Sequence, residues 1–184
     1  MGYYCVANSP RYVSAASSLL VTRMLKHPTD PTHDPETSES LIDFLQRILP
    51  RHSYLIFSQP SEILSHIFHF ILAAFRGRDQ LPKLVAADFL SALLCLNDLP
   101  ADQQQTVQSA LEHLGPLIAG NIVYNISGNA ARSELDKVCD PLRKLVVRHS
   151  AAKTWLQGAL FSDNFSSDRV KDSEKTAFLQ KIIK

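Results

Sequence analysis

The chain has 184 residues and a formal net charge of +1, and 45% of its residues are hydrophobic. That length suits one domain with its own core or a few units of a repeat array, and the hydrophobic share excludes a disordered chain. The small net charge provides no global field that would favour a nucleic acid or an anionic membrane as partner.

The cysteines and the chain termini bear on the cellular compartment. Cys5, Cys95 and Cys139 are odd in number, far apart and outside any Cys-x-x-Cys pattern. This spacing favours reduced thiols in a cytosolic or nuclear protein over a disulfide framework. No secretory signal pattern and no run of about 20 apolar residues is found, so we expect no membrane span. We therefore expect the chain in the cytoplasm and the nucleus.

The hydrophobic pattern is helical nearly throughout, because apolar residues recur at three- and four-residue steps. No long run alternates apolar and polar residues at period two, so we expect no strand. In chain order, the predicted helices span residues 10–26, 40–49, 61–76, 82–97, 101–126, 130–149, 151–161 and 172–184.

Prolines and glycines set the expected boundaries and bends. A Pro-rich acidic loop over residues 27–37 follows the first helix. Pro50 should end the second helix, because proline cannot donate the helical hydrogen bond. The Gly115-Pro116 pair should kink or split the fifth helix, and Pro141 should bend the sixth.

The predicted helices pair in chain order: first with second, third with fourth, fifth with sixth, and seventh with eighth. A polar loop over residues 162–171 lies within the last pair. The pairs begin about 40 to 50 residues apart, which is typical of helical-hairpin repeats. The sequence therefore predicts an all-α, HEAT- or armadillo-like solenoid of about four helix pairs, with residues 1–184 as one repeat segment. A compact helical bundle would give a similar pattern and remains the alternative.

Motifs for catalysis are absent from the sequence, which has no phosphate-binding loop, dinucleotide fingerprint or nucleophile elbow. His66 and His69 lie three residues apart on one predicted helix, with Glu62 a turn earlier. These three residues make an incomplete zinc set, and histidines at a helix interface are the simpler interpretation. We expect no enzyme, no cofactor and no metal. A closed cavity on which these three side chains converge would argue otherwise.

The strongest candidates for partner contact lie in the C-terminal third. Residues 130–153 hold six basic residues against three acidic ones. A solvated face is the simpler interpretation, and a patch for an acidic partner segment is the alternative. The only tryptophan, Trp155, is expected to be a packing anchor, with partner contact as the alternative. The candidate partner-binding residues are Arg132, Asp136, Arg143, Lys144 and Trp155.

A specific resemblance lies in the same region. The run Gly128-Asn129-Ala130-Ala131-Arg132-Ser133-Glu134-Leu135-Asp136 resembles the G-x-A-x-R-S-x-x-D turn and helix of the transportin-SR and importin-thirteen branch of importin-beta receptors. In those receptors a tryptophan-bearing helix follows, as residues 153–160 do here. A loop and a helix similar to residues 172–183 come next.

The resemblance implies a nuclear transport receptor segment whose solenoid wall binds protein cargo for import into the nucleus. Members of that family carry serine/arginine-rich splicing factors and other nuclear proteins. Their Ran GTPase site lies largely in an amino-terminal arch, so Ran is expected as a partner of a full-length parent and not of this chain alone. The chain is accordingly expected to be a fragment of a longer array. We expect no nucleic-acid partner. The alternative is a generic helical-repeat scaffold or adaptor without transport activity.

Overall fold

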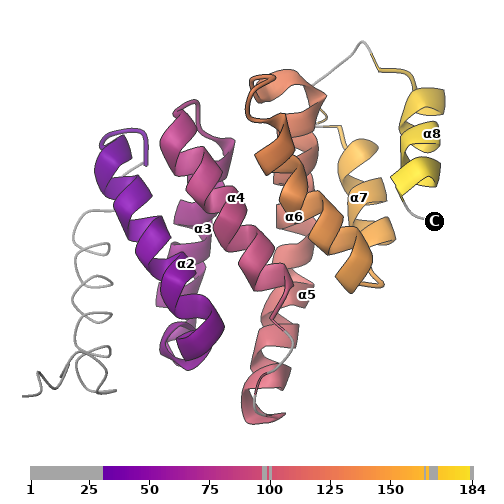
Figure 1. Cartoon of the computed structure of the whole chain (residues 1–184). Helices are drawn as coiled ribbons and strands as arrows, with labels where there is room; N and C mark the ends of the chain where they lie inside the picture. Colours follow the sequence, from indigo (N-terminus) through magenta and orange to yellow (C-terminus); the bar gives the residue numbers. More distant parts are fainter. Residues whose placement is uncertain (1–30, 97–98, 100, 164, 166–169, 183–184) are drawn as a thin grey trace, which may run out of the picture.

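The computed structural model describes residues 31–96, 99, 101–163, 165 and 170–182, and these residues form helices joined by turns and loops (Figure 1). The all-α fold class is confirmed. The first predicted helix, residues 10–26, lies outside the described residues. The elements are α2 Pro35–Phe57, α3 Ser61–Arg76, α4 Gln80–Leu94, α5 Ala101–Tyr124, the π-helical turn η2 Asn125–Asn129, α6 Leu135–Arg148, α7 Ala152–Leu160 and α8 Asp172–Ile182.

The helices lie in two rows. One row contains α2, α4 and α6, in which α4 packs extensively against both of its neighbours (Figure 1). The second row contains α3, α5 and α7, with α5 packed closely against α7, and α8 follows at the end of α7. The predicted partners α3–α4, α5–α6 and α7–α8 are in contact. The most extensive contacts nevertheless join helices that are two apart in sequence.

The N-terminal end of α2 lies earlier than predicted. The Asp34 carboxylate caps the helix by accepting hydrogen bonds from the Thr37 backbone N (3.0 Å) and the Thr37 hydroxyl (2.6 Å). Pro35 occupies the first turn, where a missing N–H costs nothing. The last residues of the predicted loop over 27–37 are therefore the start of a helix.

The C-terminal half of α2 contradicts the predicted stop at Pro50. The helical conformation is interrupted at His52 (φ −136°, ψ 38°), two residues after Pro50, and a second helical stretch follows directly and ends at Phe57. Leu55, Ile56 and Phe57 beyond the bend are buried. The free energy of burying such side chains, about 1.5–3 kcal/mol each, offsets the local cost of a proline inside a helix, about 3 kcal/mol.

Later prolines also fall inside helices. The fifth predicted helix is not split, because α5 runs through Gly115 and Pro116. The sixth helix, α6, runs through the buried Pro141. The sixth helix begins at Leu135 instead of residue 130. Gly128 has φ 120°, a left-handed conformation that favours glycine, and the chain turns there before α6 starts.

The hydrophobic core lies between the two rows. Phe75 and Phe89 are completely buried, as are Ile71, Leu93 and Ile122. The Phe68 ring packs between elements, with ring centroids 6.2 Å from Phe57 of α2 and 6.3 Å from Phe89 of α4. Residues from both rows thus share one continuous core.

Candidate functional site

A buried polar junction joins α4 to the turn before α6. The Lys83 ammonium donates to Glu134 Oε2 at 2.8 Å, and the two side chains are only 2% and 5% exposed. The same carboxylate oxygen accepts from the Ala131 backbone N at 2.9 Å. Glu134 therefore holds the turn closed and fastens it to α4. Because both side chains are buried, the pair stabilises the packing of the turn on α4 and does not contribute to the exposed surface.

A second set of contacts, centred on the buried Asn125, connects the ends of α3 and α5. Asn125 is completely buried, and its Nδ2 donates to the backbone oxygen atoms of Phe75 (2.9 Å) and Asn121 (3.1 Å). The Arg76 guanidinium lies 4.0 Å from the centroid of the Tyr124 ring, a cation–π contact. The turn after α5 is thus anchored to the second row as well as to α4.

Four of the predicted partner-binding residues are exposed. Arg132 lies in the turn before α6, and Asp136, Arg143 and Lys144 are exposed on α6 itself. Arg143 pairs with Asp140, with Nη1 and Oδ1 2.6 Å apart. We call this surface, Arg132 with the exposed side chains of α6, the α6 face.

Burial changes the charge balance of residues 130–153. Of their three acidic residues, Glu134 is buried, which leaves Asp136 and Asp140 beside six exposed basic residues. Lys137 pairs with Asp88 of α4 at 2.8 Å, and the hydrogen bond that the ammonium donates to this carboxylate raises the pKa of Lys137. With Glu134 buried, the remaining charged residues of 130–153 are six basic against two acidic, and part of that positive charge is already paired.

Trp155, the fifth predicted residue, lies in a different environment. A Cβ atom built on Gly115 would come within 2.5 Å of the Trp155 ring, so the indole packs directly on bare backbone of α5. The His149 ring lies 6.2 Å from the indole, centroid to centroid, and His149 Nε2 donates to the Leu94 carbonyl at 3.1 Å. These contacts bring α4, α5 and α7 together at the corner between α6 and α7.

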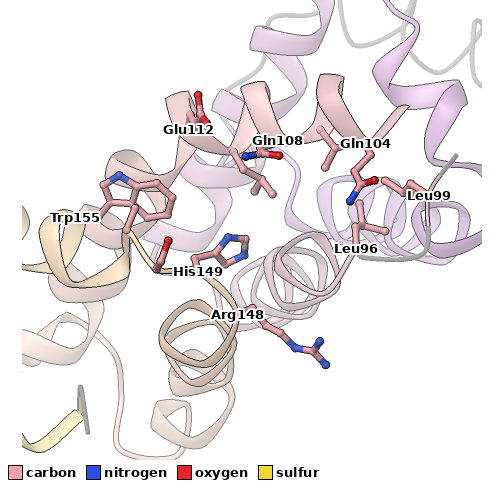
Figure 2. Close-up of a pocket in the computed structure, with 12 residues that line it drawn as sticks. Leu96, Leu99, Gln104, Gln108, Glu112, Arg148, His149 and Trp155 are labelled. Atoms are coloured by element: carbon pink, nitrogen blue, oxygen red, sulfur yellow. The ribbon is translucent and has the colours of Figure 1, made fainter. Parts of the chain in front are cut away.

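A pocket with a volume of about 340 Å³ opens beside Trp155 (Figure 2). Its walls come from the connection after α4, the first half of α5, the corner from Arg148 to Ala151, and Trp155 of α7. Apart from Trp155, no sequence pattern points to the pocket, because its lining residues come from separate segments of the chain. The lining residues are Leu96, Leu99, Gln104, Val107, Gln108, Leu111, Glu112, Arg148, His149, Ser150, Ala151 and Trp155.

The histidine pair on α3 stands apart from this pocket. His69 is exposed, and its Nδ1 lies 2.7 Å from the Ser65 carbonyl oxygen of its own helix. In the part of the chain that the structure describes, no three His, Cys, Asp or Glu side chains are grouped so that they could hold a metal. Cys95 and Cys139 are free thiols, and burial raises the pKa of the Cys139 thiol. None of these residues is among those that line the pocket.

Comparison with protein-family models and with curated proteins finds no match to this chain. Among the described helices, none is both long and apolar enough to span a membrane.

Proposed function

We propose that this chain is a segment of a nuclear transport receptor of the importin-beta superfamily, in its transportin-SR and importin-thirteen branch, and forms part of the wall on which protein cargo binds. The observation that carries the proposal is the stacking of α2, α4 and α6 in one row and of α3, α5 and α7 in the other. In a HEAT- or armadillo-like solenoid, successive helical hairpins stack in this manner and one row lines a concave binding wall.

The run from Gly128 to Asp136 gives independent support. This is the run that resembles the importin-beta receptors, and it forms the connection between α5 in one row and α6 in the other. Gly128 supplies the left-handed turn, and the buried Lys83–Glu134 pair fastens that connection to the neighbouring helix. A stack of hairpins needs such a connection at each repeat, because each hairpin is stable only against its neighbours.

The proposed mechanism is binding by shape and charge without chemical conversion. The α6 face offers basic side chains to an acidic segment of a cargo protein, with an attraction that weakens as salt is added. Nucleotide-bound Ran acts on another part of the longer receptor. Transport requires the protein in both cytoplasm and nucleus.

A pull-down with purified proteins tests the proposal. The immobilised chain is offered a phosphorylated serine/arginine-rich splicing factor, the same factor without its serine/arginine-rich region, and Ran loaded with GTP. We expect retention of the intact factor only, because phosphorylation makes the serine/arginine-rich region acidic. Failure to retain the factor at physiological ionic strength would contradict the proposal and leave a generic helical scaffold. Tight retention of Ran would contradict the assignment of the Ran site to another region.

A pair of matched variants tests the surface. Reversing the charge at Arg132 and Lys144 (R132E/K144E) should weaken retention of the factor several-fold, since both side chains are exposed on the α6 face. The control reverses Arg51 on α2 and Arg78 after α3 (R51E/R78E), which are also exposed. Equal weakening by both double variants would mean that only the overall charge matters.

A further inference from the structure

The last helix, α8, is the least buried of the described α-helices. Leu179 is the only buried residue among its 11, whereas α3 buries six residues and α4 buries eight. Among the described helices, α7 is the only one against which it packs appreciably, and Figure 1 shows it at the edge of the molecule. A helix shorter than about 12–15 residues is marginal alone in water. The stability of α8 therefore depends on its contact with α7.

One narrow stripe of α8 faces the rest of the chain. The side chains of Phe178, Leu179 and Ile182 pack against the hydrophobic core. Lys175 lies one turn before them on the same face, because residues three and four apart are neighbours on a helix. The remaining side chains of the helix are exposed. The stripe thus begins with a charged residue where an apolar one would be expected.

The Lys175 ammonium lies over two aromatic rings that precede α8 in the chain. It is 4.4 Å from the ring centroid of Phe165 and 5.4 Å from that of Phe161. The Phe161 backbone N donates to the Gln157 carbonyl of α7 at 3.1 Å, so this residue is fixed to the end of that helix. Lys175 therefore connects α8 to α7 through its charge, in addition to the apolar stripe.

The aromatic rings hold this ammonium more firmly than its carboxylate partner does. The Lys175 side chain is only 12% exposed, whereas Asp172, whose Oδ1 lies 3.3 Å from Nζ, is 80% exposed. An ion pair with an exposed carboxylate contributes little to stability, and a cation–π contact gains strength as water is removed from the cation. The contact with Phe161 and Phe165 is therefore the main interaction that a charge-removing change at Lys175 would lose.

We propose that α8 detaches from α7 and returns as a unit while the other described helices stay folded, and that the contact of Lys175 with Phe161 and Phe165 sets the fraction of time for which it is detached. Detachment loses one buried and a few half-buried side chains, so its free energy is well below that of global unfolding. It uncovers the apolar stripe and the α7 surface that the stripe contacts. The helix thereby controls access to this end of the stack, and the inference does not rest on the proposed function.

Native-state hydrogen exchange of the full chain, followed by mass spectrometry, tests the detachment. Amides of residues 176–182 report on α8, because the first four amides of a helix have no partner within the helix. We expect these amides to be protected, but at least about tenfold less than those of α3 and α4. Protection compares each amide with its intrinsic exchange rate, so the difference measures the detached fraction.

Two substitutions at Lys175 separate its charge from its size. Lys175→Gln removes the cation and should lower the protection of α8 about tenfold, with α3 and α4 unchanged. Lys175→Arg keeps a cation over the rings and should retain most of the protection. The control is Lys181→Gln, which removes the same charge from an exposed position in the last turn of α8 and should change the protection by about threefold or less.

A double-variant cycle assigns the effect to the ring. Phe165→Leu removes the nearer ring and keeps an apolar side chain, and Lys175→Gln should lower the protection much less in this background. The inference is overturned if the α8 amides are unprotected, or are protected as strongly as those of α4. It is also overturned if Lys181→Gln matches Lys175→Gln, if Lys175→Gln lowers the protection of α4 equally, or if its effect is unchanged in the leucine background.

Discussion

Replacing Gly115 with alanine should destabilise the chain, although the same change usually stabilises a helix. Gly115 lies inside α5, where alanine is favoured over glycine by about 1 kcal/mol. A Cβ atom at this position would lie 2.5 Å from Trp155 ring carbons, whereas carbon atoms pack best about 3.5–4.0 Å apart. The indole must therefore move by about 1 Å, which opens the contact between α5 and α7.

The size of the effect follows from these two opposing contributions. Overpacking of this kind costs about 1–3 kcal/mol, so Gly115→Ala should lower the free energy of unfolding by up to about 2 kcal/mol. Gly120 provides the matched control, because it lies in the same helix and a Cβ there meets nothing within 4 Å. Gly120→Ala should raise the stability by up to about 1 kcal/mol.

Urea denaturation followed by far-ultraviolet circular dichroism measures both changes. Gly115 also precedes Pro116, and a Cβ before proline disfavours the helical conformation by itself. Repeating Gly115→Ala in a Trp155→Leu background separates the two causes, since only the ring contact is removed. The reasoning is refuted if Gly115→Ala is as stabilising as Gly120→Ala, or if its cost is the same in the leucine background.

Three further predictions concern the buried pair, the first cap and the proline of α2. Lys83→Met leaves the Glu134 carboxylate buried without its partner and should cost about 3–5 kcal/mol in urea denaturation, and adding Glu134→Gln should recover most of it. The hydrogen bonds from the hydroxyl and backbone N of Thr37 lower the pKa of the Asp34 carboxyl below its ordinary 3.8, so the cap stabilises α2 above that pH and is lost as the pH falls through the folded pKa. Carboxyl NMR titration should give a midpoint below 3.8, and Asp34→Ala should abolish this acid-dependent loss of helicity. Pro50→Ala should raise the melting temperature, because it restores a helical N–H donor at an exposed position. An unchanged or lower melting temperature would mean that the bend at His52 has another cause.

Local sequence signals were sufficient where a helix has a clear stop at each end. The predicted helix over 61–76 matches α3 residue for residue, because Pro60 precedes it and Gly77 follows it. At Pro50 the same local rule predicts the break, which the structure has at His52, but not the helical stretch that follows it. Burial of the segment beyond that proline depends on α4 and the rest of the core, which a local pattern does not contain.

The pocket could not be predicted for a related reason. Its walls come from segments that are up to about sixty residues apart in sequence, and no spacing rule connects them. Trp155 was singled out from the sequence, but its contact with Gly115 was not. The sequence pattern predicts a kink or break at Gly115, whereas in the structure the Trp155 ring packs against the space that a side chain at this position would occupy.

In the run that resembles the importin-beta receptors, some residues have a role in the fold and another lies on the exposed surface. Gly128 has a conformational role, since its φ of 120° disfavours any side chain. Asp136 lies in the first turn of α6, where a carboxylate stabilises a helix N-terminus. Arg132 is exposed and forms no ion pair with another described residue. The fold therefore explains the glycine and the aspartate of this run but not its arginine. Charge reversal at Arg132 should accordingly change the binding of a partner and leave the stability of the chain unchanged.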